Sequence, residues 1–301
     1  MPQTRPGLDS STAPVDTAGR EARNTTPHRY GVIGFPIDHS YSPLIHRLFA
    51  EQTGENLTYT RLAAKPEEFQ RAVRRFAADG GRGLNVTVPH KEAAFELADE
   101  LEPEAERAGA VNTLSFTDDG RIRGDNTDGI GFRADIERNH ELALRGKRTL
   151  VLGAGGAARG VVAALLDARP GELVLANRTV QRATDLLATL GAPANFSACP
   201  LPALSDQEPF DVVVNATSLG LHAAKLPFPP NCLSQDTFAY DLVYGPHKTP
   251  FVDWAIRHGA GKAVQGWGML VEQAAESFVI WRGVRPDTAP VLKRVLEQVR
   301  S

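Results

Sequence analysis

A short apolar run that opens into glycines and then becomes helical constrains this chain more than any other stretch. Residues 150–158, LVLGAGGAA, lead directly into a helical run. In this order Gly153 permits a tight turn, Gly155 lets phosphates approach the backbone, and Ala158 packs the helix close to its strand. The pattern favours a pyrophosphate bound at a helix N-terminus. On its own it also fits a glycine-rich strand-to-helix turn that binds nothing.

The segment after the next predicted strand indicates which dinucleotide such a turn would bind. Residues 172–176 form a second apolar run, which ends at Asn177-Arg178-Thr179-Val180-Gln181-Arg182. The second strand of this motif normally ends near an acidic residue that binds the ribose hydroxyls of NAD, and no acid follows the strand here. Arg178 and Arg182 instead offer guanidinium groups, which suit a 2′-phosphate, so the sequence predicts NADP. The alternative is that both arginines belong to a solvated helix start.

Composition limits the classes of partner. The chain has 301 residues, 42% of them hydrophobic and 23% charged, enough for one large or two modest domains. The net charge of −3 gives no basic excess for nucleic acid or an anionic membrane, and no apolar stretch approaches the roughly 20 residues that cross a bilayer. The two cysteines, Cys199 and Cys232, argue against a disulfide framework or a zinc site and fit a reducing compartment, so we expect a cytoplasmic protein.

The order of the predicted elements divides the chain. Residues 1–27 are polar and charged with almost no apolar side chains, so we expect a disordered extension. From residue 147 onward, strands and helices alternate regularly, which predicts a parallel sheet with crossover helices. The expected fold is therefore α/β with two domains. A substrate-binding catalytic domain with a mostly parallel sheet spans 28–126 plus 266–301, with C-terminal helices returning to it, and a Rossmann-type NADP domain spans 127–265.

Periodicity and turn residues place the individual elements. We expect strands near 30–35, 57–62, 83–88, 110–116 and 121–123, a strand beginning at about 147, and strands near 172–176, 211–215 and 237–243. We expect helices near 43–53 and 66–78, from about 89, from 128 to 139, and near 156–168, 179–190, 269–281 and 287–299.

Two charged residues stand at predicted helix starts. Lys91 follows Pro89, which favours a first helical turn, and a cation at the positive end of a helix dipole in a dry site suits acid–base chemistry. Asp128 stands at the other start. A solvated lysine and a helix N-cap are the alternatives for the two positions. Brought together in a cleft, they would form a proton-relay pair suited to interconverting a ketone and an alcohol beside a nicotinamide.

Neutral polar side chains complete the candidate set, namely Ser40, Ser42, Asn85, Thr87, Asn112 and Gln273. All except Gln273 lie at a predicted strand end or in an adjoining loop, where sheets of this type bind ligands. Hydroxyls and amides suit a substrate with several hydroxyl groups and a carboxylate, although each residue alone also fits a turn or a cap. We expect no metal. His39, His90, His222 and His247 lack a ligand spacing and are interpreted as structural or exposed, and the acidic run at 125–129 lacks the closing Glu of an EF-hand.

Taken together, these segments resemble the shikimate dehydrogenase family, from about Tyr30 to the end of the chain. The resemblance depends on separated motifs in a fixed order. These are Ser40-Tyr41-Ser42-Pro43, Asn85-Val86-Thr87-Val88-Pro89-His90-Lys91, Gly109-Ala110-Val111-Asn112-Thr113, Gly124-Asp125-Asn126-Thr127-Asp128-Gly129, Gly153-Ala154-Gly155-Gly156-Ala157, Asn177-Arg178-Thr179, Asn215-Ala216-Thr217-Ser218 and Gly266-Trp267-Gly268-Met269-Leu270-Val271-Glu272-Gln273.

The resemblance implies roles for these residues. Lys91 and Asp128 would be the catalytic pair, and Ser40 and Ser42 would hold the substrate carboxylate. The ring hydroxyls would contact Asn85, Thr87, Asn112 and Gln273, with Tyr244 at a further substrate position. The NADP contacts would be Gly153, Ala154, Gly155, Gly156, Ala157, Asn177, Arg178, Thr179, Arg182, Thr217, Gly266 and Met269. The implied activity is the reversible NADPH-dependent reduction of 3-dehydroshikimate to shikimate, in chorismate and aromatic amino-acid biosynthesis, by a monomer or homodimer.

Two departures and two alternatives accompany this resemblance. The N-terminal extension is unusual, and Gln265 stands where an Asp is frequent, which could alter how the returning segment hinges. One alternative is a quinate/shikimate dehydrogenase that uses NAD, against which the arginines after residue 176 argue. The other is a catalytically silent nucleotide-binding regulator of the same fold, which would predict the loss of Lys91 or Asp128, and both are present.

Overall fold

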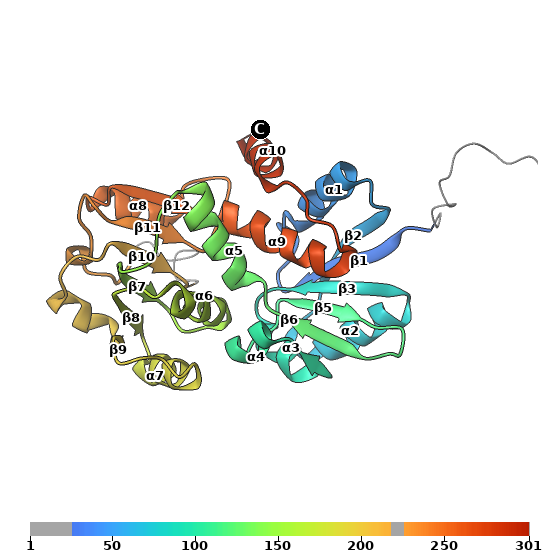
Figure 1. The fold of residues 1–301 in the computed structure, drawn as a ribbon, viewed down its shortest axis with the longest axis horizontal. Coiled ribbons are helices and arrows are strands. Elements are labelled where there is room, and N and C mark those ends of the chain that lie inside the picture. Colours follow the sequence, from blue (N-terminus) through green and yellow to red (C-terminus); the bar gives the residue numbers. More distant parts are fainter. Residues whose placement is uncertain (1–25, 218–225, 301) are drawn as a thin grey trace, which may run out of the picture.

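The computed structural model describes residues 26–217 and 226–300, and the chain forms two lobes, each built on a six-stranded sheet (Figure 1). The predicted disordered extension, apart from its last two residues, lies outside the described residues, as do Ser218 and His222. The predicted α/β class with two mostly parallel sheets is confirmed.

The first lobe contains a mixed sheet with the strand order β2-β1-β3-β5-β6-β4. Strands β1, β2 and β3 run parallel, whereas β5 is antiparallel to both β3 and β6. The bounds are β1 His28–Gly34, β2 Leu57–Ala63, β3 Gly81–Val86, β4 Glu100–Leu101, β5 Thr113–Phe116 and β6 Ile122–Asp125, with helices α1 Ser42–Thr53, α2 Phe69–Ala78, α3 Lys91–Leu97 and α4 Pro103–Ala108. Helix α2 buries Phe69, Val73 and Phe76 on one face, at the predicted helical spacing.

The second lobe contains an entirely parallel sheet with the order β12-β11-β10-β7-β8-β9. Its bounds are β7 Arg148–Leu152, β8 Glu172–Asn177, β9 Phe196–Pro200, β10 Val212–Asn215, β11 Phe238–Asp241 and β12 Lys262–Gln265, with α6 Gly156–Ala168, α7 Val180–Thr189 and α8 Pro250–Arg257. Clusters of buried aliphatic and aromatic side chains cover both faces of this sheet. The strand order reverses between β7 and β10, and sheets of this kind bind ligands at that point, beyond the carboxyl ends of the strands.

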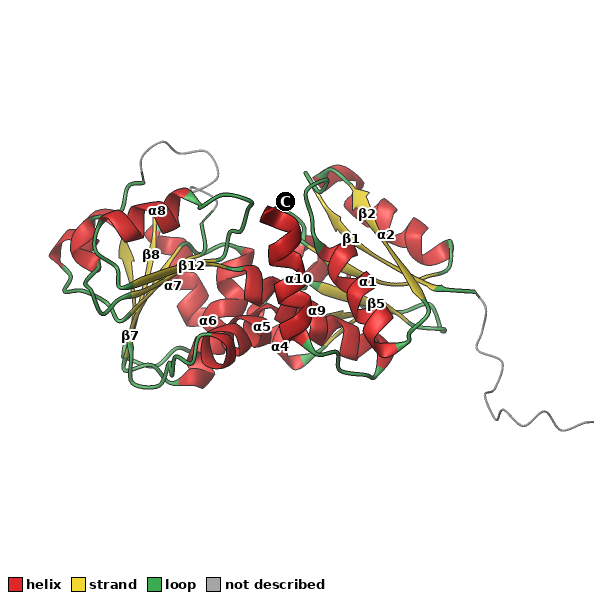
Figure 2. Cartoon of the chain, turned by 90° about the horizontal axis from the view of Figure 1, so that it is seen from above, coloured by secondary structure: helices red, strands yellow, loops and turns green. Residues whose placement is uncertain are grey.

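Two helices lie between the lobes, α5 Asp128–Ala134 and α9 Trp267–Arg282, and both views show them there (Figures 1 and 2). Helix α10, Thr288–Arg300, packs against α1 and α9. Glycines allow α5 to approach its neighbours closely. A Cβ at Gly131 would lie 2.6 Å from Gln273 of α9, and one at Gly129 would lie 2.6 Å from the Gly160 carbonyl of α6. This close packing holds the first residue of α5 near both lobes.

Several elements differ from the sequence-based expectations. The helix expected to run to residue 139 is α-helical only to Ala134 and continues as a π-helical turn, Asp135–Asn139. The strand expected at 237–243 is limited to Phe238–Asp241. Strands β4, β9 and β12 and helices α4 and α8 were not predicted, because elements this short contain too few residues to show a period. Within 26–217 and 226–300, every helix is too short or too polar to span a membrane.

Candidate active site

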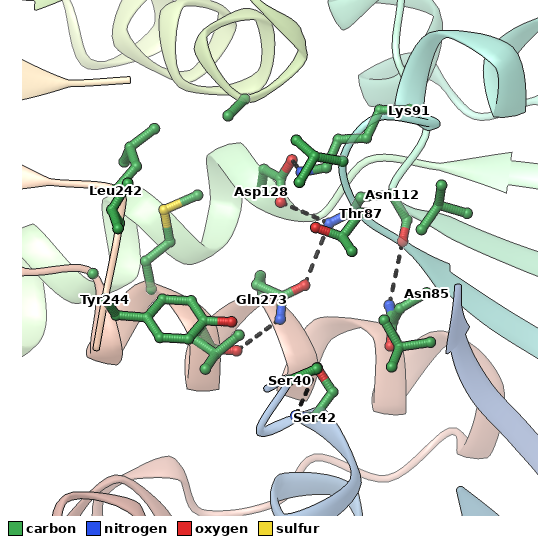
Figure 3. Close-up of a pocket in the computed structure, with 18 of the residues that line it drawn as sticks. Ser40, Ser42, Asn85, Thr87, Lys91, Asn112, Asp128, Leu242, Tyr244 and Gln273 are labelled. Carbon is green, nitrogen blue, oxygen red and sulfur yellow. Dashed lines mark hydrogen bonds and ion pairs between the residues drawn. The ribbon is translucent and has the colours of Figure 1, made fainter. Parts of the chain in front are cut away.

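A cavity of about 260 Å³ opens between the two lobes (Figure 3). Its wall contains all the residues predicted to bind substrate or to act as the catalytic pair, namely Ser40, Ser42, Asn85, Thr87, Lys91, Asn112, Asp128, Tyr244 and Gln273. Four of the predicted cofactor residues, Ala157, Thr217, Gly266 and Met269, line the same cavity. The fold therefore gathers side chains from both lobes and from α9 around one space.

Lys91 and Asp128 form an ion pair at the wall of this cavity. Lys91 is the first residue of α3 and Asp128 is the first residue of α5, and the Lys91 Nζ donates to Asp128 Oδ2. Their side chains are only 11% and 6% exposed. The second carboxylate oxygen accepts a bond from Asn112 Nδ2 at 2.9 Å. Asp128 is not the N-cap of α5, because it is the first residue inside the helix. The N-cap is Thr127, whose side chain makes no capping bond.

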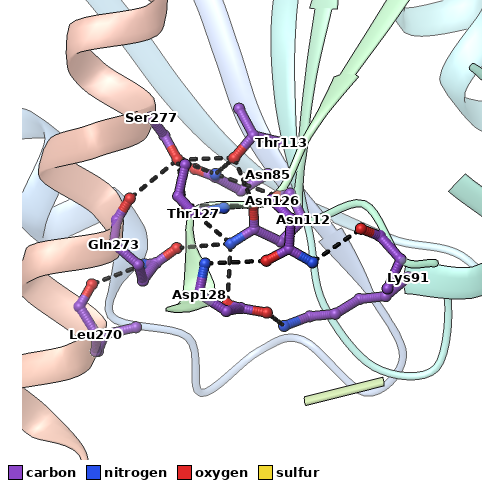
Figure 4. A network of polar contacts seen from close by, with 11 residues as sticks. Asn85, Lys91, Asn112, Thr113, Asn126, Thr127, Asp128, Leu270, Gln273 and Ser277 are labelled. Carbon is purple, nitrogen blue, oxygen red and sulfur yellow. Dashed lines mark hydrogen bonds and ion pairs between the residues drawn. The ribbon is translucent and has the colours of Figure 1, made fainter. Parts of the chain in front are cut away.

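Asn112 is the centre of the polar network behind the pair (Figure 4). Its Nδ2 donates to Asp128, to Thr127 Oγ1 at 2.9 Å and to Gln273 Oε1 at 3.3 Å. Its Oδ1 accepts from the Thr127 backbone N–H at 2.9 Å and from Thr113 Oγ1 at 2.9 Å. Because both ends of the amide are bonded within the protein, Asn112 fixes the orientation of Asp128 as well as facing the cavity.

Ser277 extends this network and was missed at the sequence level. It lies on α9, one turn beyond Gln273, and its hydroxyl lies 2.8 Å from Asn85 Nδ2 and 2.8 Å from Thr113 Oγ1. Asn85 also accepts a bond from the Tyr59 hydroxyl at 2.7 Å. A serine in a helix gives no signal of such a role, because only the packing of α9 against β3 and β5 brings it there.

The two serines proposed for a carboxylate lie close together at the start of α1. The Ser40 and Ser42 hydroxyl oxygens are 3.3 Å apart, and both residues are buried. Arg61 on β2 donates to the Ser40 carbonyl from Nε at 3.0 Å and from Nη2 at 2.5 Å. The guanidinium group thus anchors the backbone that presents these hydroxyls, another role that the sequence did not reveal.

Tyr244 reaches the cavity from the loop that follows β11. Burial and the neighbouring Tyr41 raise the pKa of Tyr244 to about 12, so its phenol stays protonated near neutral pH. Gln265 holds this loop, since its Oε1 accepts from the Gly245 N–H at 2.7 Å and its Nε2 donates to the His247 carbonyl at 3.0 Å. The departure at residue 265 therefore acts on the segment beside Tyr244.

The glycine-rich turn lies over the catalytic pair. Gly153 has φ +102°, and a Cβ there would lie 2.9 Å from Thr217 Cγ2, so the position requires glycine for both reasons. At Gly155 a Cβ would meet nothing within 4 Å, which leaves the N-terminus of α6 open to a ligand. A Cβ at Gly156 would lie 3.5 Å from Lys91 Cβ. This open, donor-rich helix start beside Lys91 fits the phosphates of a dinucleotide.

The remaining predicted cofactor residues lie outside the cavity wall. Asn177 ends β8, the strand next to β7, and its Nδ2 donates to the Thr179 carbonyl at 2.8 Å. Arg178, Thr179 and Arg182 are exposed around the start of α7. They stand at the same edge of the sheet as the glycine-rich turn, because β7 and β8 are parallel.

The histidines play different parts. His90 is buried, with Nε2 at 2.8 Å from the Ala64 carbonyl and its ring stacked on Phe69, which is a structural role. His39 is exposed, as expected, but also lines the cavity. Among the described residues, no group of three or more His, Cys, Asp or Glu side chains could hold a metal ion.

Comparison with known proteins yields consistent matches along the chain. Residues 32–114 match the shikimate dehydrogenase substrate binding domain, residues 136–223 match the shikimate / quinate 5-dehydrogenase model, and residues 266–296 match the shikimate 5'-dehydrogenase C-terminal domain. A shikimate dehydrogenase (NADP(+)) of Alkalilimnicola ehrlichii is 56% identical over 264 residues, which is 88% of this chain and 97% of that protein.

Solved structures agree with these matches. The crystal structure of an Ael1 enzyme from Pseudomonas putida is 46% identical with a TM-score of 0.82, covering 89% of this chain and 97% of that chain. The shikimate 5-dehydrogenase of Thermus thermophilus, in complex with NADP(H) and shikimate, is 34% identical with a TM-score of 0.79. The match covers 90% of this chain and 99% of that chain. With the cavity, the glycine-rich turn and relatives of this identity in agreement, the chain belongs to the shikimate dehydrogenase family.

Proposed function

We propose that this protein catalyses the reversible NADPH-dependent reduction of 3-dehydroshikimate to shikimate. The observation that carries the proposal is the Lys91–Asp128 ion pair, which lies in the wall of the interlobe cavity beside the glycine-rich turn. A relative that is 56% identical is an NADP-dependent shikimate dehydrogenase, and one related structure contains both NADP(H) and shikimate.

The proposed chemistry follows from the contacts of the pair. Asp128 accepts from Lys91 and from Asn112, so it holds the ammonium group against the cavity wall. The ammonium group has further N–H donors beyond the one that Asp128 occupies. In the direction of reduction, Lys91 donates a proton to the substrate carbonyl oxygen as it becomes a hydroxyl, and in the reverse direction it accepts that proton.

The other end of the cavity orients the substrate. Ser40 and Ser42 offer two hydroxyl donors to the carboxylate, at the N-terminus of α1, where a negative charge is favoured. Thr87, Asn112 and Gln273 lie between the serines and Lys91, and Tyr244 and Asn85 stand on either side. All five are proposed to bind the ring hydroxyls. Holding both ends of the ring would fix which oxygen faces Lys91.

NADP is the proposed cofactor, and when bound it supplies the hydride. Gly153, Ala154, Gly155, Gly156 and Ala157 would hold its phosphates, and Asn177, Arg178, Thr179 and Arg182 its 2′-phosphate. Thr217, Gly266 and Met269 would form the nicotinamide end, since they line the cavity that Lys91 faces. The exposed arginines favour NADP over the NAD-dependent alternative.

An absorbance assay of cofactor reduction tests the proposal, with NADP or NAD paired with shikimate or quinate. We expect NADP with shikimate to give the highest kcat/KM by at least about tenfold. Highest activity with quinate and NAD would favour the alternative dehydrogenase. No turnover with any pair, together with retained NADP binding, would favour the silent regulator.

The proposal includes several less specific features. We propose domain bounds of 28–126 plus 266–301 for substrate binding and 127–265 for the cofactor, supported by one sheet in each part. We also propose a cytoplasmic location, supported by the two free cysteines, Cys199 and Cys232. A monomer or a homodimer is expected, and light scattering at assay concentration distinguishes the two.

A further inference from the structure

Asp135 is a buried carboxylate that takes no direct part in the proposed chemistry. It follows the last residue of α5, at the start of the π-helical turn, and is 1% exposed. Its Oδ2 accepts from the Tyr240 hydroxyl at 2.5 Å and from the Met269 backbone N–H at 3.1 Å, and its Oδ1 accepts from Asn139 Nδ2 at 2.9 Å. Burying a charge is costly unless hydrogen bonds offset it, and here the donors come from three separate segments.

The bond to Met269 lies in the first turn of α9. This turn has backbone N–H groups with no partner inside the helix, and the N-cap residue Gly266 offers no side chain to satisfy them. A carboxylate next to a helix N-terminus supplies both an acceptor and a favourable charge. Gly268 makes the approach possible, because a Cβ at that residue would overlap the Asp135 carboxylate. Asp135 therefore caps α9 from a neighbouring helix.

The two helices joined in this way both contribute residues to the cavity wall. Asp128 begins α5, whereas Met269 lines the cavity from the first turn of α9, and Gln273 bonds Asn112 one turn later. We propose that Asp135 is a positioning residue whose carboxylate fixes the start of α9, and with it Met269 and Gln273, relative to Asp128. The catalytic part of this assignment rests on the proposed function, but the capping of α9 can be measured without turnover.

The capping is tested by amide hydrogen exchange with mass spectrometry on the full-length protein without cofactor. Asp135→Asn keeps the shape and removes the charge. We expect exchange in residues 266–273 to quicken by about tenfold or more, while β7 and β10 exchange as in the wild type. Asp185→Asn, an exposed change on α7, is the matched control and should leave 266–273 unchanged. Wild-type exchange of 266–273 in Asp135→Asn would overturn the capping.

Gly268→Ala gives a second test that does not depend on the folding of Asp135→Asn. Alanine is a better helix former than glycine, so without a cap the substitution should slow exchange at the start of α9. If Asp135 caps the first turn of α9, the added methyl group must displace the carboxylate, and amide exchange in that turn should quicken instead. Slower exchange in Gly268→Ala would therefore contradict the proposal.

Kinetics test the consequence for the site. In Asp135→Asn we expect kcat to fall by about tenfold and the primary deuterium isotope effect on kcat, with NADPH deuterated at the transferred position, to increase, because misplacing Met269 slows hydride transfer. A merely structural role would lower Tm and leave the isotope effect unchanged. If Asp135→Asn exchanges faster but the wild type itself does not turn over shikimate, the proposed function is refuted and the capping of α9 still holds.

Discussion

The ammonium group of Lys91 donates a hydrogen bond to the carboxylate of Asp128, although 37 positions separate the two residues in the chain. One residue begins a helix of the first lobe and the other begins the helix between the lobes. Both side chains are largely removed from solvent, so each depends on the other for charge compensation. The predictions below test this pair and the contacts that surround it.

Lys91→Ala should lower kcat by about 100-fold or more while changing the KM for shikimate little, because the proton donor is lost and the ring contacts remain. Steady-state kinetics with NADP and shikimate measure both constants. Lys248→Ala, an exposed lysine, is the control and should behave as the wild type. The thermal stability of the variant should be measured alongside the kinetics, because Asp128 loses its buried partner. Near-wild-type turnover would remove the proton-relay role.

Arg178→Ala should raise the apparent KM for NADPH by about 10- to 100-fold, the loss expected for a charge-assisted hydrogen bond to a phosphate. The KM for NADH should change by less than about twofold, because NADH has no 2′-phosphate. Arg71→Ala, on α2 of the other lobe and 81% exposed, controls for the change in net charge. Equal effects on the two cofactors would show that Arg178 does not bind the 2′-phosphate.

Arg61→Gln should raise the KM for shikimate by about tenfold with little change in kcat, because Arg61 anchors the Ser40 carbonyl at the end of the cavity that is proposed to hold the substrate carboxylate. Arg61→Lys separates charge from geometry. It retains the cation but loses the planar fork that donates to one carbonyl from two nitrogens. An unchanged KM in both variants would exclude a role for Arg61 in presenting the serine hydroxyls.

His46 should contribute a pH-dependent term to stability. Its ring is fully buried and stacked on Tyr59, with centroids 4.1 Å apart, and burial lowers the pKa of His46 to about 3. Between pH 6.5 and 3 the unfolded chain binds a proton that the folded protein does not, so the contribution of His46 to stability falls as the pH is lowered.

His46→Phe measures this term by difference. The free energy of unfolding is measured in urea at pH 7 and at pH 5. Between these two pH values it should fall by about 2 kcal/mol more in the wild type than in the variant. The wild type must be compared with the variant because two other groups also make stability depend on pH. Burial raises the pKa of both Asp125 and Asp241 to about 6, so between pH 6 and 3.8 their contribution to stability rises as the pH is lowered, opposite to that of His46. An equal pH dependence in both proteins would show that His46 does not remain neutral. His247→Phe, at an exposed position, is the control.

Much of the architecture could be predicted from local sequence. The helix at 156–168 has the predicted bounds because a long apolar period, a glycine start and a strand before it all agree. Short or irregular elements could not be predicted in this way. Strand β9 and helix α8 were not predicted, and the π-helical turn after Ala134 interrupts a helix that reads as continuous.

The sequence by itself determined the two-sheet fold class and the glycine-rich turn, because strand and helix periods and the demands of a tight turn are local properties. Its motifs also named the residues that surround the cavity. Only the tertiary structure decided which groups support them. The contacts of Ser277 with Asn85, of Arg61 with Ser40 and of Asp135 with Met269 join residues 192, 21 and 134 positions apart. Such contacts leave no periodic trace in the chain, because they arise only when the packing of whole helices and strands brings distant side chains together.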